Sequence, residues 1–304
     1  MRSSSLILGT GLLALAGCRS GARPPERATQ PLARQGYVTV DGARLYYEES
    51  GSGLAVVMLH GGRLDRREWD NEFPALAREF RVIRYDSRGY GLSQSDSVPF
   101  SDHDDLRVLL DSLGIARAAL VGHSFGGRTS IDFALAWPDR VTALVLVAPG
   151  LSGSRFSSDV YRRFEADMMS AVRSEGPAVG LAWFMRGWCD GPYRSPEQMD
   201  STVRAKVLEM ASGTGARRAR REITSLGRGP EAPAAGRLGE LRMPTLAVVG
   251  SLYMPDIIHI VDSVATRVRG ARRVDISGVA HNVNMERPAE FLAAILPFLR
   301  EHAR

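Results

Sequence analysis

The stretch "LVGHSFGG", residues 120–127, carries the strongest indication of fold in this chain. An apolar run leads into the pattern Gly-x-Ser-x-Gly, and the residues from 125 to about 137 favour a helix. A strand, a sharp turn and a helix in this order form a nucleophile elbow. The flanking positions must be glycine because side chains there would collide in so sharp a turn. The start of the helix favours developing negative charge. We therefore predict that Ser124 is a catalytic nucleophile.

Further buried strands flank this stretch on both sides. Continuous apolar runs, which are typical of strands buried on both faces, occupy residues 54–60, 81–86, 118–123, 141–148 and 245–250. Helical patterns separate them; the segment 101–114 places its leucines at helical spacing behind Ser101, a suitable N-cap. Shorter alternating segments flank Asp41-Gly42, which suits a hairpin turn. This alternation predicts an α/β fold with a mostly parallel, doubly wound sheet.

The regular alternation stops between about residues 151 and 237. That segment is helical in character, and we predict that it is an inserted helical cap. The α/β core then comprises residues 37–150 and 238–304, which is within the size of one large domain. The cap contains large apolar side chains that either face an apolar substrate or form the interior of the cap itself: Trp183, Phe184, Met185 and Trp188.

A serine hydroxyl needs a base to accept its proton. The chain has six histidines, and His281 alone stands in a loop after a strand near the C-terminus, within "DISGVAHNVNMERPAEF" (275–291). Two others, His60 and His123, lie inside the motifs, and the remaining three lie on helices or in the tail. We predict that His281 is the general base.

The segment "MLHGGR", residues 58–63, ends a buried strand in two glycines, where the chain can turn tightly and expose backbone N–H groups. Such groups stabilise the oxyanion of acyl-transfer intermediates. We predict donors at the N–H of Phe125, directly after the nucleophile, and at the N–H of Gly62. We interpret His60 as a structural residue.

From about Tyr37 onward, the chain resembles the α/β-hydrolase superfamily. The resemblance rests on the elbow, the "HGG" loop, "YDSRGYGLS" (85–93) and the terminal "GVAHNVNMERPAEF". In amino-acid sequence, these segments are most similar to capped hydrolases that include enol-lactonases, carboxylesterases and cofactor-free haloperoxidases. Epoxide hydrolases and haloalkane dehalogenases share the fold but use an aspartate nucleophile, and Ser124 argues against both.

The resemblance also implies a catalytic acid, commonly three residues after the glycine that closes the penultimate strand. From Gly250 that position is Tyr253, whose phenol cannot act as a carboxylate does. The nearest carboxyl is Asp256, which we treat as the candidate acid. Two alternatives remain: Asp256 only caps the following helix, or the acid lies elsewhere.

The N-terminal residues 1–18, "MRSSSLILGTGLLALAGC", have the layout of an export signal, with a short apolar core behind Arg2. The "LAGC" ending resembles a bacterial lipobox and implies lipidation at Cys18 and attachment to a membrane of the cell envelope. An ordinary cleaved signal is the alternative. Residues 19–36, rich in Pro, Arg and Gly, are predicted to be a disordered tether. With Cys18 acylated, Cys189 would have no disulfide partner.

Charge and composition exclude several other classes. The net charge is +5, and its densest cluster lacks the interleaved aromatic residues of a nucleic-acid surface, so no nucleic-acid partner is expected. That cluster consists of Arg217, Arg218, Arg220 and Arg221. No metal cluster, phosphate loop or dinucleotide fingerprint is evident, and no cofactor is implied. The leading hypothesis is a serine hydrolase acting on an apolar ester or lactone. A binding protein on a hydrolase scaffold, and a perhydrolase or carbon–carbon hydrolase using the same residues, remain alternatives.

Overall fold

The computed structural model describes residues 34–96, 98–213 and 226–303. The predicted export signal, its Cys18 and the arginine cluster at 217–221 lie outside the described residues. Among the helices that are described, none combines the length and the apolar character needed to cross a membrane.

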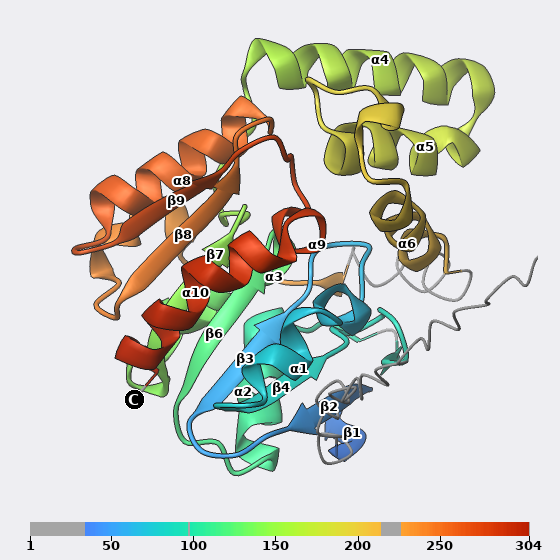
Figure 1. The fold of residues 1–304 in the computed structure, drawn as a ribbon. Coiled ribbons are helices and arrows are strands. Elements are labelled where there is room, and N and C mark those ends of the chain that lie inside the picture. Colours follow the sequence, from blue (N-terminus) through green and yellow to red (C-terminus); the bar gives the residue numbers. More distant parts are fainter. Residues whose placement is uncertain (1–33, 97, 214–225, 304) are drawn as a thin grey trace, which may run out of the picture.

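One sheet organises the described part of the chain (Figure 1). Its strands are β1 (Arg34–Val40), β2 (Ala43–Ser50), β3 (Ala55–Leu59), β4 (Arg81–Tyr85), β5 (Gln94–Ser95), β6 (Ala118–His123), β7 (Val141–Val147), β8 (Thr245–Gly250) and β9 (Arg272–Ile276). Their spatial order is β1-β2-β4-β3-β6-β7-β8-β9, with β5 paired to β2. The strands from β4 to β9 in this order are parallel, whereas β2 pairs antiparallel with both β1 and β4. The predicted mostly parallel sheet is therefore confirmed.

Helices cover both faces of this sheet (Figure 1). The helices and the two short turns used below are η1 (Arg66–Trp69), α1 (Glu72–Leu76), α2 (Asp102–Ser112), α3 (Phe125–Ala136), α4 (Asp159–Glu175), α5 (Gly180–Phe184), η4 (Met185–Asp190), α6 (Ser201–Ser212), α8 (Pro255–Arg267), α9 (Val283–Glu286) and α10 (Pro288–His302). One core buries Leu106 of α2, Ile131 of α3 and Ile257 of α8 against one face. A second core buries Phe73 of α1 and Phe291 of α10 against the other.

Strand β6 lies in the middle of the sheet, between β3 and β7. Leu120 belongs to one core and Val121 to the other, because successive side chains of a strand point to opposite faces. A strand with a core on each side must be apolar throughout, which is why this segment shows no polar alternation. The strand ends at His123, so Ser124 follows at the carboxyl edge of the sheet, where open α/β sheets bind their ligands.

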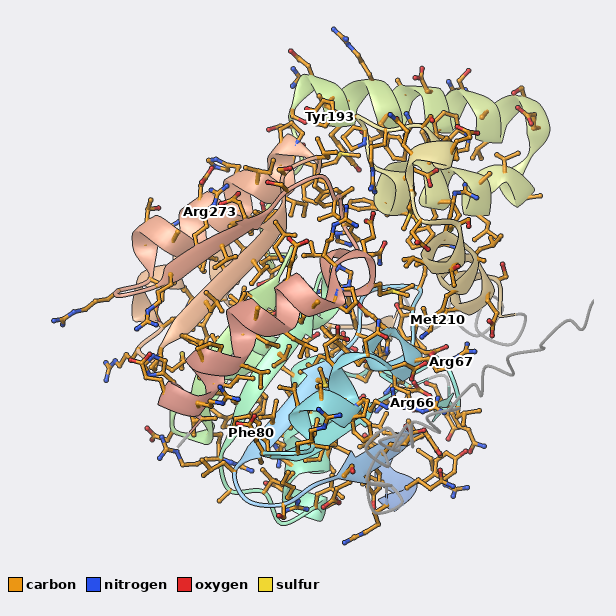
Figure 2. All side chains as sticks on the ribbon, viewed as in Figure 1. Arg66, Arg67, Phe80, Tyr193, Met210 and Arg273 are labelled. Atoms are coloured by element: carbon orange, nitrogen blue, oxygen red, sulfur yellow. The ribbon has the colours of Figure 1, made fainter. Side chains whose placement is uncertain are left out.

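Helices α4, α5 and α6 form a separate group above the sheet, and we call this group, together with η4, the lid (Figure 1). Ion pairs attach its helix α6 to the core around η1: Arg67 lies 2.5 Å from Glu209, and Lys206 lies 2.7 Å from Asp70. Figure 2 shows Arg67 close to Met210 at this junction. The lid is therefore attached to the core by polar contacts as well as by the chain itself.

The N-terminal strand begins earlier than the sequence predicted. Arg34 already belongs to β1, so the last three residues assigned to the tether are part of the sheet. The hydroxyl of Tyr46 on β2 donates to Gln35 Oε1 at 2.7 Å. The local composition could not reveal this, because the partner strand β2 supplies the stabilising contacts. The predicted hairpin turn is present, and Gly42 adopts the positive φ of 63° that such turns require.

Candidate active site

Ser124 occupies the sharp turn between β6 and α3. Its φ is 51° and its ψ −110°, a conformation that residues with a side chain rarely adopt and that is found at strained functional sites. A Cβ on Gly122 would lie 2.5 Å from the carbonyl oxygen of Gly126, and a Cβ on Gly126 would lie 2.3 Å from that of Leu59. The Ser124 N–H donates to the carbonyl of Val147 at 2.9 Å. The turn therefore has the geometry of a nucleophile elbow.

The loop after β3 lies directly beside this elbow. The N–H of Gly126 donates to the carbonyl of His60 at 3.1 Å, which joins the backbones of the two segments. The N–H of Phe125 belongs to the first residue of α3, where no intrahelical acceptor exists. Gly62 follows two residues after His60 in the adjoining loop. The two predicted oxyanion donors thus come from neighbouring backbone segments.

His60 is buried and stabilises this loop through its ring. Its Nε2 accepts a hydrogen bond from the N–H of Ser87 at 3.0 Å, so the proton of the neutral ring must be on Nδ1. Nδ1 then donates to the carbonyl of Gly61 at 2.8 Å. Both ring nitrogens are occupied by backbone groups, which agrees with the structural role that we assigned to His60.

His281 lies in the loop between β9 and α9 and is buried among aromatic rings. Its ring stacks on Tyr253, with centroids 4.5 Å apart and an interplanar angle of 21°. The ring of His123, the residue before the nucleophile, lies 4.3 Å away, and that of Trp188 on the lid lies 5.8 Å away. Packing therefore restricts the histidine ring from three sides.

Within the described part of the chain, no carboxylate forms a hydrogen bond with the imidazole. Among the described residues, Nδ1 of His281 has no hydrogen-bond partner, although it is buried. Burial, with a further contribution from the charge of His123, lowers the pKa of His281 well below its ordinary value of 6.5. The ring is therefore neutral at pH 7 and able to accept a proton. The imidazolium that would result lacks the partner that an aspartate provides in a complete triad.

The candidate acid Asp256 does not contact His281 in this structure. Its carboxylate accepts hydrogen bonds from the N–H of Ser157 at 2.6 Å, from the N–H of Ser158 at 2.9 Å and from the Ser158 hydroxyl. Although partial burial opposes ionisation, these hydrogen bonds hold the pKa of Asp256 below its ordinary value of 3.8. Asp256 is not the N-cap of its own helix either, because Met254 holds that position in α8. It instead anchors the start of lid helix α4 to the core.

Tyr253 holds the position that the family resemblance assigns to the acid. Its side chain is fully buried, and its hydroxyl has no hydrogen-bond partner among the described residues. Burial raises the pKa of Tyr253 well above its ordinary value of 10.0, so the phenol carries no charge near neutral pH. Tyr253 therefore orients His281 by stacking and cannot stabilise its charged form as a carboxylate would.

Replacing Asp256 by asparagine is expected to change kcat/KM for an activated ester by less than about 10-fold, because the carboxylate binds the lid and not His281. The free energy of unfolding should fall by about 1–2 kcal/mol, since hydrogen bonds to a charged acceptor become hydrogen bonds to a neutral one. Ester kinetics and urea unfolding test both expectations. Asp262→Asn, on the exposed side of the same helix, is the matched control.

The opposite outcome has a clear meaning. A loss of about 10⁴-fold in the Asp256→Asn variant, with the fold intact, is the effect of removing a triad acid. It would show that Asp256 reaches His281 during the reaction.

Two buried residues that we did not single out from the sequence belong to this site. His123 Nδ1 lies 2.6 Å from Glu68 Oε1 of η1, and both side chains are completely buried. A histidine on a buried strand requires polar partners. The position of His123 at the end of an apolar strand could therefore have shown that it has a buried polar partner. The partner could not be identified from the sequence, because Glu68 lies in a short turn without periodicity.

The pattern that describes the alpha/beta hydrolase fold matches residues 55–288, which include the elbow and the histidine loop. The chain belongs to the alpha/beta hydrolase family. This hydrolase chain is 39% identical over 124 residues to the 2-hydroxy-6-oxo-6-phenylhexa-2,4-dienoate hydrolase of Comamonas testosteroni. That alignment covers 37% of this chain and 43% of the relative, so the chain matches less than half of the relative's length.

Two other hydrolases match a larger share of this chain. A soluble epoxide hydrolase from Corynebacterium sp. strain C12 is 29% identical over 275 residues, which cover 85% of this chain and 94% of that protein. The structure of a thermophilic esterase from Thermogutta terrifontis superposes with a TM-score of 0.70 at 26% identity and covers 88% of this chain and 99% of the esterase. These three proteins are all hydrolases, but their names indicate different kinds of substrate.

The lid contributes one aromatic ring to the active site of this hydrolase. Trp188 lies on the π-helical turn η4, a type of turn frequently found at functional sites. Its ring centroid is 6.3 Å from that of Tyr253. Met185 of the same turn is instead buried in a cluster between the lid and the core, with Leu64 and Met285 from the core. Of the apolar cap residues identified in the sequence, Trp188 thus contacts His281, while Met185 packs the lid against the core.

Proposed function

We propose that this protein is a serine hydrolase that cleaves a carboxylic ester or lactone through an acyl-enzyme. The observation that carries the proposal is Ser124, held at a φ of 51° at the carboxyl edge of the sheet beside the loop of His281. In the proposed reaction, Ser124 Oγ attacks the carbonyl carbon and His281 accepts the hydroxyl proton. The N–H groups of Phe125 and Gly62 stabilise the oxyanion. His281 then protonates the leaving alkoxide and activates the water that releases the acyl group.

The proposed machinery is a serine–histidine pair without a carboxylate at Nδ1 of His281. The stacking of Tyr253 replaces the orienting part of the missing acid, but not its charge. In a complete triad, the acid holds the tautomer and stabilises the imidazolium, and its loss costs roughly 10⁴-fold in kcat. We therefore expect slow turnover, with substrates that have good leaving groups preferred over amides.

Trp188, which is half-buried on the lid, presents aromatic surface beside the base, and this favours an apolar acyl or alcohol group. A second candidate reaction is the hydrolysis of a carbon–carbon bond in a dienoate-type substrate. The 39% identity to the dienoate hydrolase of Comamonas testosteroni favours it, and the same serine and histidine would serve. The structural similarity to an esterase favours the first candidate.

Labelling of the full-length protein with a fluorophosphonate, followed by peptide mass spectrometry, tests the proposal. We expect one adduct per chain, at Ser124.

The pH dependence of labelling supplies a second prediction. Because the pKa of His281 lies well below 6.5, the base stays neutral as the pH falls from 8 to about 6.5. The labelling rate should therefore decline only at lower pH. An acid limb centred at or above 6.5 would contradict the burial of His281. Absence of labelling in the folded protein would favour the alternative of a binding protein on a hydrolase scaffold.

The cellular location is a separate proposal, which rests on residues 1–18 alone. We propose export and lipid attachment at Cys18, which would place the hydrolase at a membrane surface of the cell envelope.

A further inference from the structure

The buried pair of Glu68 and His123 has no part in the reaction proposed above, yet it contacts every loop that this reaction uses. Glu68 Oε1 lies 2.6 Å from His123 Nδ1, and neither side chain has exposed surface. An ion pair in the interior contributes little net stability compared with apolar residues of the same size. Its presence here therefore calls for a different explanation, which its contacts provide.

The first contact joins the pair to the oxyanion loop. The N–H of Gly61, next to the predicted donor Gly62, donates to Glu68 Oε2 at 2.7 Å. A Cβ on Gly61 would lie only 2.6 Å from His123 Nδ1, so this loop can approach the pair only because the residue is glycine. One carboxylate thus accepts a hydrogen bond from the backbone of the oxyanion loop with one oxygen and lies against the ring of the elbow histidine with the other.

The second contact joins the pair to the catalytic base. His123 Nε2 donates to the backbone carbonyl of His281 at 3.1 Å. His123 also directly precedes Ser124. Through this one side chain, the loop that carries the base is fixed to the turn that carries the nucleophile, across 158 residues of sequence.

We infer that Glu68 is a positioning residue that acts through His123 to hold the oxyanion loop, the nucleophile elbow and the His281 loop in one arrangement. The inference rests on the proposed function, because it concerns the geometry of the same site. Catalytic groups displaced by about 1 Å can lose as much as about 10²-fold in rate. The Nδ1 atom of His281 has no hydrogen bond from any residue that the structure describes. The backbone bond from His123 therefore carries more of the positioning than it would in a complete triad.

The variant Glu68→Gln tests the inference with little change of shape. The amide oxygen can still accept the Gly61 N–H, but the negative charge opposite His123 is lost. We expect kcat for an activated ester to fall by about 10-fold, and the rate of fluorophosphonate labelling at Ser124 to fall equally. KM should stay within about 3-fold, because the variant disturbs the geometry of the transition state more than the binding of substrate. Glu79→Gln, at an exposed carboxylate paired with Arg300, is the matched control.

A pH profile supplies a readout that loss of packing alone would not move. Burial and then the charge of His123 lower the pKa of His281, so replacing the His123 ring should let the pKa of His281 rise toward the ordinary value. The acid limb of kcat/KM should then move to higher pH. The other rings that face His281 are those of Tyr253, after β8, and Trp188, on η4, and neither is charged near neutral pH.

Removing one member of a buried pair can also unfold a protein, so a second variant is needed. In His123→Gln, the side-chain amide can still donate to the His281 carbonyl, while the ion pair is gone. If the pair acts as a unit, the double variant should lose no more activity than the worse single variant, as a double-mutant cycle reveals. If Glu68→Gln alone is unstable, the double variant is compared with His123→Gln, because removing the carboxylate should cost no further activity once His123 is replaced.

Each outcome separates the inference from the proposed function. Absence of labelling in the unaltered protein overturns the proposed function, and this inference with it. Normal labelling of the unaltered protein, with folded Glu68→Gln and His123→Gln variants that keep kcat and the acid limb unchanged, overturns the inference alone. Additive losses in the double variant also contradict it, since they would mean that the two residues act independently.

Discussion

Replacing Ser124 by alanine is expected to lower kcat for an activated ester by about 10²-fold and to abolish fluorophosphonate labelling. In a complete triad, removal of the serine costs roughly 10⁶-fold and removal of the acid alone roughly 10⁴-fold, and these effects are not additive. Since no acid among the described residues forms a hydrogen bond with Nδ1 of His281, part of that loss is expected to be present already in the unaltered protein. The remaining factor is about 10²-fold, and a larger loss would indicate that the base is activated in another way.

Steady-state kinetics with a p-nitrophenyl ester, together with mass spectrometry of the labelled protein, measure this effect. Ser174→Ala, at an exposed position of lid helix α4, is the matched control and should retain full activity. A Ser124→Ala variant that keeps the rate within a factor of two of the unaltered protein would show that the hydrolysis occurs at another residue. Its elbow would then serve binding only.

Replacing Glu286 by glutamine is expected to lower the free energy of unfolding by about 3 kcal/mol, because breaking a buried ion pair leaves an uncompensated charge. Arg194, which follows the lid turn η4, approaches Glu286 of α9 at 2.6 Å through one nitrogen and at 3.2 Å through another. The two side chains are only 5% and 3% exposed. The guanidinium also donates to the carbonyl of Asp190, so it cannot turn into solvent without losing further hydrogen bonds.

Urea unfolding of the Glu286→Gln variant measures this loss. The matched control is Glu301→Gln, which removes a carboxylate from a pair with Arg272 whose side chains are 53% and 54% exposed. That change should alter the free energy of unfolding by less than about 1 kcal/mol, as is usual for surface pairs. Equal effects at the two positions would mean that the lid is not fastened to the core by the buried pair.

The site combines an elbow of the usual form with an unusual environment for its base. His281 is oriented by Tyr253 on one ring face and by the bond from His123 to its backbone. Trp188 adds a contact from the lid. This arrangement fixes the position of the histidine by packing and backbone contacts, whereas a carboxylate would also stabilise the charged ring. An enzyme built in this way depends on burial, because a mobile imidazole would lose its alignment with the serine.

The sequence by itself determined which segments form the buried strands and the elbow, because both follow from the local pattern of residues. The β6 strand was predicted with its observed limits, since a strand with a core on each face must be continuously apolar. The glycines around Ser124 likewise follow from local sterics. The helix over residues 101–114 was predicted within two residues of its observed ends, although Ser101 makes no capping hydrogen bond through its side chain.

Only the tertiary structure decided which partners the charged side chains have. Asp256 follows the expected acid position closely in sequence, yet its carboxylate binds Ser157, 99 residues away. Glu68 and His123 meet because η1 packs against the end of β6, which no local pattern records. A carboxylate can bind any donor that the fold brings within about 3 Å, and that choice depends on how distant segments pack. The sequence therefore specified the turn that holds Ser124, whereas the fold determined what surrounds His281.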